Sequence, residues 1–468
     1  MQIPQTMQEQ YRQAREIIEN SNDIKVYSHI DCDGICSGAI LSTILDRQNK
    51  EHEIEFVNLD VLDNIELTHE LTIFSDLGSG QLIDTNAKEG QKIIILDHHP
   101  PLRDLSYKDD KNYTYLEINP LHHGIDGSYY VCGGGLCYFL AKEFGYDDLS
   151  WIGVLSAIGD MQNTGSGHFE GLNEIIQQDA IDGGYLEVTE NDLNIYGRNT
   201  RPLFVALSYF NDVKLPITNN TTETMAVLEE LGIDEKHNRK TLNQLTMAEK
   251  GKIYQYLVEN ISKVVPGKYI KYIPRLIIGD SYAFMKEDSD SFLRDASEFS
   301  TAMNACGRNH EEKIAMEVLK GDRFVALDEL EEVSLNHRRN LAQAISSVAE
   351  GDETNIIEME NLQYFDGTGI KPEIVGTIAG MILGYCNWKK PVIGFTQTDE
   401  EGLKVSLRCS RLLSYDGIHF GNMIREVAGE VGGTGGGHSM ACGAYIPLDK
   451  KSEFLELFND KLNGKITN

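Results

Sequence analysis

The first third of the chain alternates short apolar runs with segments whose apolar residues recur at helical spacing. The apolar runs predict strands at Ile24–Ser28, Glu53–Leu59, Leu71–Ser75, Lys92–Leu96 and Tyr115–Ile118. The helical spacing predicts helices from Asp33 to about Asn49, over Leu136–Phe144 and over Trp151–Ile158. Strands that alternate with helices in this way are typical of a parallel α/β sheet, which we predict here.

The pattern changes twice farther along the chain. The middle, roughly Phe169–Gly321, is less regular and mostly helical, and Arg323–Glu350 predicts one long helix. The last third returns to α/β: a strand near Asn355–Met359, a helix over Val375–Tyr385, a hairpin over Val392–Ser406 and then Gly432–Gly437. We therefore predict an α/β protein in four parts: a parallel-sheet domain (1–200), a largely helical intermediate region (201–322), a connecting helix (323–350) and a C-terminal α/β domain (351–468).

Four short acidic and histidine motifs stand where predicted strands or helices end. They are Ser28–Gly34 (SHIDCDG), Ser75–Gly78 (SDLG), Leu96–Pro100 (LDHHP) and Ile158–Asp160 (IGD). In open parallel sheets, ligands bind beyond the carboxyl ends of the strands. We therefore expect one edge of the sheet to gather these motifs.

Each motif also has a structural interpretation when it is taken alone. His29, Asp31 and Asp33 alternate and would face one way in an extended segment, but Asp33 could equally cap the next helix. Asp76 alone is typical of a turn, and Asp160 of a helix end. Asp97-His98-His99 is harder to explain structurally, because three titratable groups directly after KIIIL are costly to desolvate without partners or a metal.

Carboxylates collected at one site repel one another unless cations are present. Two divalent ions about 3.5–4 Å apart would remove that repulsion and supply a hydroxide for in-line attack on phosphorus. Mixed oxygen and nitrogen ligands favour Mn²⁺ over Mg²⁺ without excluding Mg²⁺. The motifs therefore favour metal-assisted hydrolysis of phosphoesters.

A glycine-rich stretch near the C-terminus is a second signal. Gly432–His438 (GGTGGGH) allows close approach of backbone N–H groups to a phosphate, although a structural tight turn is an alternative. It is neither a Walker A loop, which needs a following Lys-Ser/Thr, nor a dinucleotide fingerprint, which has other glycine spacing. Ser406-Leu407-Arg408, His438 and Arg308 favour an anion site, while a surface salt bridge would explain any single arginine.

Bulk properties narrow the class of protein. The chain has 468 residues, no apolar run long enough to span a membrane and no signal segment, so we expect a cytoplasmic protein. Its eight cysteines include no C-x-x-C pair, which disfavours a zinc ribbon. The formal net charge of −31 counts against a long nucleic-acid substrate, unless the substrate groove is locally basic.

The motifs resemble those of the DHH phosphoesterase superfamily. Asp97-His98-His99 matches its naming motif, the other motifs follow in the expected order, and Gly435–Gly443 (GGGHSMACG) is similar to the signature of the DHH-associated C-terminal domain. Ala296–Phe299 through Gly307-Arg308, with Lys404–Arg408, looks most like the archaeal RecJ-like single-strand-specific exonucleases. This resemblance implies an N-terminal DHH domain and a C-terminal DHH-associated domain.

The resemblance also implies an activity and roles for particular residues. It implies a Mn²⁺-dependent exonuclease on single-stranded DNA or RNA, often 5′ to 3′, in DNA replication, repair or RNA turnover, with the GINS replication complex as a partner. The implied metal ligands are His29, Asp31, Asp33, Asp76, His98 and Asp160. His99 would contact the scissile phosphate and Asp97 would orient its neighbours, so that Asp76, Asp97 and His99 form the catalytic set. The implied substrate-binding residues are Arg308, Ser406, Arg408, Gly436, Gly437 and His438.

Two other functions compete with the exonuclease. One is a phosphodiesterase for short oligonucleotides or cyclic dinucleotides. The other is a replisome scaffold that binds GINS, like the eukaryotic helicase subunit related to RecJ; such scaffolds have lost metal ligands, and every expected ligand is present here. Bacterial RecJ carries an additional OB-type domain for DNA, and because we recognise no such segment in this sequence, we do not expect tight binding of long DNA.

Overall fold

The computed structural model of the chain describes residues 1–110, 112–233, 239–349, 355–398 and 402–466. These residues form two compact units, each built from two segments of the chain. The N-terminal unit comprises Met1–Asp192 and Gly279–Leu335, and the C-terminal unit comprises Leu193–Ile278 and Asn336–Asn468. The four-part division of the sequence stays a prediction, and residues 350 and 351 at one of its boundaries lie outside the described residues.

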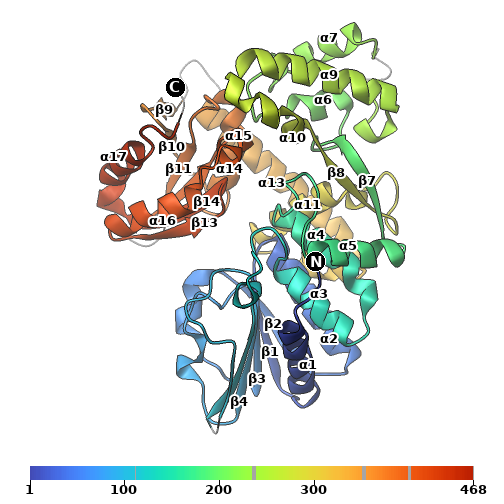
Figure 1. Cartoon of the computed structure of the whole chain (residues 1–468), viewed down its shortest axis with the longest axis vertical. Coiled ribbons are helices and arrows are strands. Elements are labelled where there is room, and N and C mark those ends of the chain that lie inside the picture. Colours follow the sequence, from blue (N-terminus) through green and yellow to red (C-terminus); the bar gives the residue numbers. More distant parts are fainter. Residues whose placement is uncertain (111, 234–238, 350–354, 399–401, 467–468) are drawn as a thin grey trace. The chain divides into compact units, whose positions relative to one another are not determined.

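The N-terminal unit is built on the predicted parallel sheet (Figure 1). Its strands are β1 (Ile24–His29), β2 (His52–Val57), β3 (Leu71–Ser75), β4 (Gln91–Leu96), β5 (Tyr107–Asp109) and β6 (Tyr113–Ile118). They lie in the order β2-β1-β3-β4-β6-β5, and all are parallel except β5, which pairs antiparallel with β6. The strand order reverses beside β1, which is where ligands bind in open sheets of this kind.

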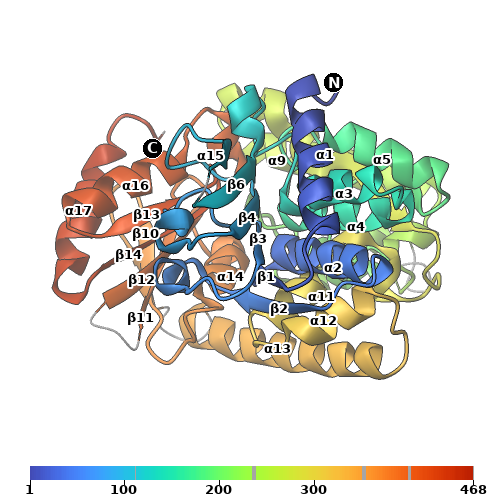
Figure 2. The ribbon, with the colours of Figure 1, turned by 90° about the horizontal axis from the view of Figure 1, so that it is seen from below.

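Apolar residues on both faces explain why the central strands form. All five residues of β3 are buried, as are the last four of β4, and a strand covered on both faces is expected to be continuously apolar. One face of the sheet packs on helices, while the other covers a smaller apolar cluster around Phe74, Ile93 and Ile95. Figure 2 shows α1 to α4 gathered on one side of the sheet.

The helices of the N-terminal unit are α1 (Gln5–Glu19), α2 (Cys32–Arg47), α3 (Gly133–Glu143), α4 (Ser150–Gly159), α5 (Asn173–Asp182), α11 (Ala296–Gly307) and α12 (Glu312–Leu319). Three of them, α2, α3 and α4, lie where helices were predicted, whereas α1 was not predicted. A two-stranded sheet of β7 (Leu186–Leu193) and β8 (Ile278–Phe284) lies where the chain passes between the units. The predicted long helix is α13 (Val325–Ala349), and it continues from one unit into the other.

The C-terminal unit combines a helical layer with a mixed sheet. Its first segment contains α6 (Leu203–Ser208), α7 (Thr221–Glu230), α9 (Met247–Val264) and α10 (Ile273–Ile277). Thr246 and Glu249 form a reciprocal capping box at the start of α9, which satisfies two of the N–H groups that a helix end leaves open. Among the described residues of both units, no helix combines the length and the apolar character needed to cross a membrane.

The C-terminal sheet has the order β13-β14-β12-β11-β10-β9. Its elements are β9 (Ile356–Glu358), β10 (Gln363–Asp366), α14 (Val375–Met381), β11 (Val392–Gln397), β12 (Gly402–Arg408), α15 (Arg411–Tyr415), α16 (Phe420–Glu430), β13 (Thr434–Gly437), β14 (Ala441–Pro447) and α17 (Lys451–Lys461). The predicted hairpin is β11–β12, although residues 399–401 of it lie outside the described part of the chain. The glycine-rich stretch forms the edge strand β13, so the tight-turn alternative is wrong for Gly435 and Gly436.

Candidate metal centre

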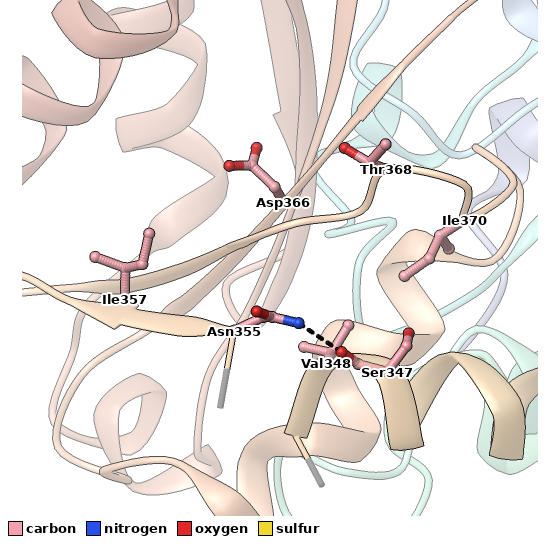
Figure 3. Close-up of a pocket in the computed structure, with 7 residues that line it drawn as sticks. All are labelled: Ser347, Val348, Asn355, Ile357, Asp366, Thr368 and Ile370. Carbon is pink, nitrogen blue, oxygen red and sulfur yellow. Dashed lines mark hydrogen bonds between the residues drawn. The ribbon is translucent and has the colours of Figure 1, made fainter. Parts of the chain in front are cut away.

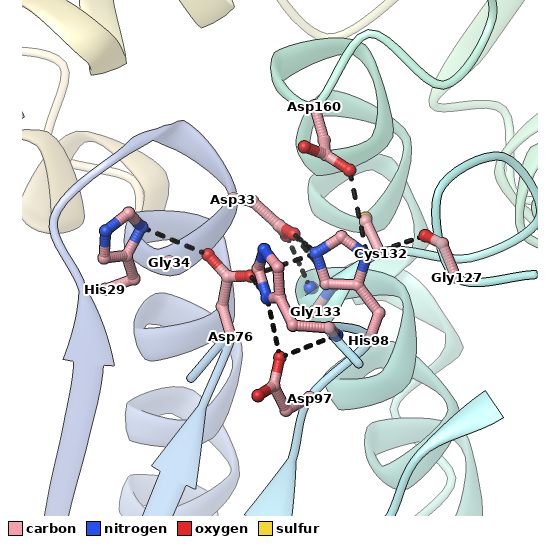
Figure 4. A network of polar contacts seen from close by, with 12 residues as sticks. His29, Asp33, Gly34, Asp76, Asp97, His98, Gly127, Cys132, Gly133 and Asp160 are labelled. Atoms are coloured by element: carbon pink, nitrogen blue, oxygen red, sulfur yellow. Dashed lines mark hydrogen bonds and ion pairs between the residues drawn. The ribbon is translucent and has the colours of Figure 1, made fainter. Parts of the chain in front are cut away.

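The four N-terminal motifs converge at the carboxyl ends of β1, β3 and β4 (Figure 4). Three groups of side chains there have ligand atoms within 4.8 Å of one another: His29, Asp31 and Asp76; Asp33, His98 and Asp160; and Asp76, His98 and His99. We call these seven residues the candidate metal centre. Asp76 and His98 each belong to two of the groups, so the centre is continuous rather than split into separate sites.

Asp76 occupies the middle of this centre in an unusual backbone conformation. Its φ is 58°, in the left-handed region that Asp tolerates better than most residues, and its side chain is buried. Asp76 Oδ2 lies 3.5 Å from His29 Nδ1, while Asp76 Oδ1 lies 3.3 Å from His98 Nε2. The two oxygens of one carboxylate therefore face two different ligand groups.

Asp33 is held by the start of α3. Its carboxylate accepts hydrogen bonds from Gly133 N at 2.8 Å, from Gly134 N at 2.7 Å and from the Ser156 hydroxyl. A helix N-terminus offers free N–H groups and partial positive charge, which stabilise a buried carboxylate. A Cβ at Gly133 would lie 2.7 Å from Asp76 Cβ, so glycine is required for this close approach.

The structure corrects the expected roles of Asp31 and Asp33. The helix cap is Asp31, whose Oδ1 accepts from Gly34 N at 3.0 Å, and not Asp33. Because α2 begins at Cys32, the segment is not extended throughout, and Asp31 and Asp33 belong to different ligand groups. Asp31 joins His29 in one ligand group, and the first turn of α2 carries Asp33 to the group that contains His98 and Asp160.

His98 presents one nitrogen to the carboxylates. Its Nδ1 lies 2.6 Å from the Gly127 carbonyl, which can only accept, so Nδ1 carries a proton. Its Nε2 lies 3.5 Å from Asp33 Oδ2 and 3.3 Å from Asp76 Oδ1. This is the arrangement of a metal-ligating histidine, whose second nitrogen is fixed by a backbone carbonyl.

Gln162 ties this histidine to Asp160. Its Nε2 donates to the Gly127 carbonyl at 2.8 Å and to Asp160 Oδ2 at 2.9 Å, and its Oε1 accepts from Asn173 Nδ2 at 2.7 Å. Both amide hydrogens are therefore used to place ligand residues. Sequence reasoning missed this role, because a glutamine two positions beyond Asp160 belongs to no motif.

The pKa directions show how strongly the carboxylates and imidazoles act on one another. Burial raises the pKa of Asp33 well above its usual range, and the nearby Asp76 carboxylate raises it further. Burial acts to lower the pKa of His98, but Asp160, Asp76 and Asp33 outweigh it and raise that pKa well above normal. For Asp31, burial acts upward, yet His29 and the hydrogen bond from Gly34 lower the pKa. The centre therefore retains protons where it lacks cations.

Asp97 and His99 form a pair at the rim of the centre. Asp97 is buried and accepts from Ser79 N at 2.9 Å and from His99 N at 3.1 Å. Its Oδ1 also lies 2.9 Å from His99 Nδ1, while the His99 side chain is 44% exposed. Asp97 thus fixes the ring of His99, which is open to an incoming ligand.

The donor set fits a pair of divalent cations. Buried His29 Nδ1, Asp76 Oδ1 and His98 Nε2 have no hydrogen-bond partner in the described part of the chain, although each faces charged neighbours within 3.5 Å. Buried polar atoms normally have a hydrogen-bond partner, so we expect these three atoms to bind a ligand. Carboxylate oxygens combined with imidazole nitrogens suit Mn²⁺. Mg²⁺ prefers oxygen ligands and fits such a site less well.

Arg308 belongs to the N-terminal unit, where it caps the end of α11. This helix end packs closely on the first motif: a Cβ at Gly307 would collide with the Ile30 carbonyl, and Asn304 Oδ1 accepts from Cys32 N at 3.0 Å. Asn304 and Gly307 thereby support the loop that carries Asp31. Their sequence distance of about 270 residues from that loop hides this contact from sequence reasoning.

The other predicted substrate-binding residues lie together in the C-terminal unit. Strand register aligns Ser406 with Gly443 and Gly443 with Gly436, so Ser406 and Gly436 are two strands apart, or about 10 Å. His438 N donates to the carbonyl of Ala441, which is the partner of Arg408 across β12 and β14. We call Ser406, Arg408, Gly436, Gly437 and His438 the candidate anion site.

Arg408 is the charged group of the candidate anion site. Its Nη1 donates to the Leu407 carbonyl at 2.8 Å, and within the described residues no carboxylate forms an ion pair with it. Burial lowers its pKa. A Cβ at Gly376 would lie 2.8 Å from Arg408 Nη2 and 3.4 Å from Ser406 Oγ, so glycine leaves room there. Sequence reasoning missed Gly376, and also Arg425, whose Nη2 lies 3.1 Å from the Cβ position of Gly436.

A pocket of about 420 Å³ lies elsewhere in the C-terminal unit (Figure 3). Its lining residues are Ser347, Val348, Asn355, Ile357, Asp366, Thr368 and Ile370. The pocket is at the end of β10 where Asp366 pairs with Phe395, whereas Arg408 pairs with Val392 at the start of β11. It contains none of the predicted site residues.

Comparisons with known proteins agree with this architecture. The sequence matches the family models of the DHH family N-terminal domain (residues 23–156), the DHH-CID domain (195–277) and the DHHA1 domain (359–464). An uncharacterized protein of Methanocaldococcus jannaschii is 31% identical over 459 residues, which cover 96% of each chain.

Solved structures are similar in fold at low sequence identity. CDC45 from Entamoeba histolytica has a TM-score of 0.60 at 14% identity, covering 97% of this chain and 98% of that one. RecJ from Thermus thermophilus in complex with Mn²⁺ has a TM-score of 0.54 at 14% identity, covering 98% of this chain and 55% of that one. An exonuclease RecJ bound to manganese has a TM-score of 0.51 at 13% identity, covering 98% and 95% of the two chains.

Proposed function

Because this chain belongs to the DHH superfamily as a RecJ-like protein, whose fold supports a phosphoesterase, we propose that it is a metal-dependent exonuclease for single-stranded DNA or RNA. We propose that two divalent cations, preferably Mn²⁺, act in the candidate metal centre and that digestion runs 5′ to 3′. RecJ structures of similar fold contain Mn²⁺ or Mg²⁺, which supports a divalent cation, and the mixed oxygen and nitrogen ligands favour Mn²⁺.

One observation carries the proposal. His98 Nε2 and Asp76 Oδ1 face each other at 3.3 Å, buried and without a hydrogen-bond partner in the described part of the chain, between further carboxylates. If the cluster were purely structural, we would expect these atoms to have hydrogen-bond partners, or a neutral residue to replace one carboxylate. The reason is that burying a charged group without a partner is costly. Two cations would satisfy both atoms at once.

The residues divide naturally between two metal positions. His29, Asp31 and Asp76 would hold one cation, and Asp33, His98 and Asp160 the other, with Asp76 contacting both. When bound, such a pair stabilises charge on the phosphate oxygens and lowers the pKa of an attacking water.

His99 would bind the scissile phosphate. Burial and His98 act to lower the pKa of His99, but Asp97 and Asp76 outweigh them and raise it, which favours the imidazolium. With Nδ1 held by Asp97, Nε2–H can donate to a phosphate oxygen from the exposed side of the ring. Asp97 is a positioning residue in this scheme, because it acts through His99.

We assign the candidate anion site to the terminal phosphate of the strand. Arg408 is a partly buried cation that has no carboxylate partner in the described part of the chain, and Ser406 lies beside it. Glycines in β13 leave the backbone accessible to a phosphate oxygen. Arg308, at the end of α11, would be a further phosphate contact.

The test uses end-labelled DNA and RNA strands of graded length, with Mn²⁺ or Mg²⁺ and with Asp76→Asn as the matched control. A ladder that grows from the 5′ end supports the exonuclease. Cleavage confined to the shortest strands would replace it with a phosphodiesterase for short oligonucleotides. No hydrolysis of any strand by the metal-loaded wild-type protein would overturn the proposed activity.

A replisome scaffold that binds GINS is the second candidate. The fold likeness to CDC45, which extends over nearly all of both chains, is the observation that favours it. The complete set of candidate ligands favours the enzyme instead. Size-exclusion chromatography with purified GINS separates the two: a stable complex formed by a protein that hydrolyses nothing would select the scaffold.

A further inference from the structure

A basic stretch interrupts the otherwise acidic C-terminal unit. Across the whole chain, acidic residues outnumber basic ones by 73 to 42. Residues 260–279 nevertheless contain Lys263, Lys268, Lys271 and Arg275 and no acidic residue. This stretch of 20 residues therefore carries four positive charges and no negative charge.

Aromatic rings lie beneath three of these four cations, Lys268, Lys271 and Arg275. Arg275 Cζ is 4.3 Å from the centre of the Tyr415 ring, and Lys271 Nζ is 4.6 Å from the centre of the Tyr272 ring. The two rings contact each other at a centroid distance of 5.7 Å. We call Lys268, Lys271, Tyr272, Arg275 and Tyr415 the basic–aromatic patch.

The patch keeps uncompensated positive charge at the surface. Lys268 is paired with Asp416 at 2.6 Å. Lys271 and Arg275 are both exposed, and within the described residues neither forms an ion pair with a carboxylate. In a chain of net charge −31, two such adjacent cations mark a surface suited to an anionic polymer.

The patch belongs to the same unit as the candidate anion site. Tyr415 ends α15, seven residues after Arg408, so at most about 25 Å of extended chain separates them. Between them, Arg411 donates to Asp212 Oδ1 at 3.1 Å and to the carbonyl of Leu276, the residue that follows Arg275. This arginine locks α15 to α10, which Figure 1 shows next to each other.

We propose that the basic–aromatic patch binds the single strand beyond its terminal phosphate. Lys271 and Arg275 would contact phosphates, while a base stacks on the Arg275 guanidinium or on the half-buried rings of Tyr272 and Tyr415. Arginine planes and aromatic rings are the usual stacking platforms for unpaired bases, and they tolerate any sequence. The inference rests on the proposed function and adds a second, length-dependent contact to it.

The patch also resolves the conflict between the acidic charge and a polynucleotide substrate. The strand would need to meet positive charge only locally, at Arg408 and along the patch, while the remaining surface stays acidic. Strands too short to reach the patch would bind through the candidate anion site alone. Affinity should therefore rise with strand length until the patch is reached.

The experiment measures strand binding by fluorescence anisotropy, with the full chain carrying Asp76→Asn so that nothing is hydrolysed. The patch variant is Lys271→Glu with Arg275→Glu. The matched control is Lys313→Glu with Lys371→Glu, two exposed lysines that make the same change in net charge. Tyr272→Leu tests stacking without a change in charge. Strands of about 3 and about 15 nucleotides are compared across a range of salt concentrations; the first is shorter than the usual single-strand site of about 4 to 16 nucleotides, and the second is near its upper end.

We expect the patch variant to bind the longer strand about tenfold more weakly or worse, with the control within about twofold of the parent. The salt slope of the binding constant should fall by about 1.4, because each phosphate contact on a single strand contributes about 0.7. Tyr272→Leu should cost about fivefold or more on the longer strand. The loss on the shorter strand should be smaller in each case.

Two outcomes overturn the inference. If the patch variant binds the longer strand as tightly as the parent, the patch does not bind the strand, and an acidic protein segment becomes the alternative occupant. If the control variant loses as much affinity as the patch variant, the loss comes from general charge repulsion and not from the patch. Lys271→Gln with Arg275→Gln, checked by its melting temperature, repeats the test if the reversed charges impair folding. A wild-type protein that hydrolyses no strand refutes the proposed function, whereas an active protein whose strand affinity ignores the patch refutes only this inference.

Discussion

The candidate metal centre gathers several buried carboxylates, whereas the candidate anion site holds a partly buried arginine that forms no ion pair with a carboxylate among the described residues. In the metal centre, burial and neighbouring carboxylates raise the pKa of Asp33. In the anion site, burial lowers the pKa of Arg408, which has no carboxylate partner among the described residues. Both shifts express the cost of holding a charge away from water without its counter-charge.

The two sites differ in how their charges are held. Asp33 is fixed by three donors, and Asp76 lies in a left-handed conformation between two ligand groups, so the metal centre is preorganised in detail. Arg408 donates a hydrogen bond to one carbonyl, that of Leu407, and occupies space that Gly376 leaves open. A metal site needs fixed geometry, whereas a terminal phosphate can be met by an adjustable guanidinium. Substitutions can test this contrast.

Removal of the shared carboxylate should have the largest effect. Asp76→Asn keeps the left-handed backbone, which Asn tolerates, but removes the charge that faces both ligand groups. We expect hydrolysis to fall about thousandfold or more, because the two proposed metal positions would lose the carboxylate that they share. Isothermal titration with Mn²⁺ and end-label assays measure the change. Asp288→Asn, which lies outside the motifs, is the control.

The same variant should become more stable without metal at alkaline pH. Removal of one carboxylate relieves repulsion with Asp33, but it also removes an anion that attracts protonated His98. At alkaline pH, where His98 is neutral, only the first effect remains, so the melting temperature of the metal-free protein should rise there by a few degrees. A metal-free variant that melts below the wild-type protein at that pH would show that the centre is not strained by its own charge.

The next largest effect is expected when the hydrogen-bond donors around Asp33 are disturbed. We call these donors, Gly133 N, Gly134 N and the Ser156 hydroxyl, the cradle of Asp33. A Cβ at Gly134 would collide with Ser156 Oγ and lie 3.3 Å from Asp33 Oδ1. Gly134→Ala should therefore displace Asp33 and weaken Mn²⁺ binding about hundredfold, as measured by titration calorimetry. Gly251→Ala in α9 is the matched control: nothing lies within 4 Å of its Cβ, and helix propensity should make it neutral or slightly stabilising. Equal Mn²⁺ affinity in the two variants would contradict the cradle.

The cradle also shows what the sequence could and could not predict. Apolar strands followed by polar residues were sufficient to predict the parallel sheet and the convergence of His29, Asp76 and His98 at one edge. The partners of Asp33 come from α3 and α4, 100 to 123 residues away, and no local pattern encodes that contact. Asp31 and Asp33 fall in different ligand groups because the helix begins at Cys32 and not one residue later, and the sequence pattern could not fix that start to a single residue.

A smaller effect is expected where a residue acts through others. Gln162 donates to Gly127 O and to Asp160, so Gln162→Glu would place an acceptor where two donors are needed. We expect Mn²⁺ affinity to fall about 10- to 100-fold, the usual range for residues that orient metal ligands. The electron paramagnetic resonance spectrum of bound Mn²⁺ should change as well. An unchanged spectrum and affinity would reduce Gln162 to a packing role.

The smallest of these effects is expected at the candidate anion site, and it should depend on the end of the strand. Arg408→Ala should slow digestion of 5′-phosphorylated strands about tenfold, which corresponds to loss of a charged hydrogen bond, and leave 5′-hydroxyl strands nearly unaffected. Arg408→Lys should recover part of the loss, since it keeps the charge but not the planar fork. Mn²⁺ affinity should not change in either variant, unlike all the metal-centre variants. Equal losses on both kinds of strand end would remove the terminal phosphate from this site, and the uncompensated guanidinium would then need another anion.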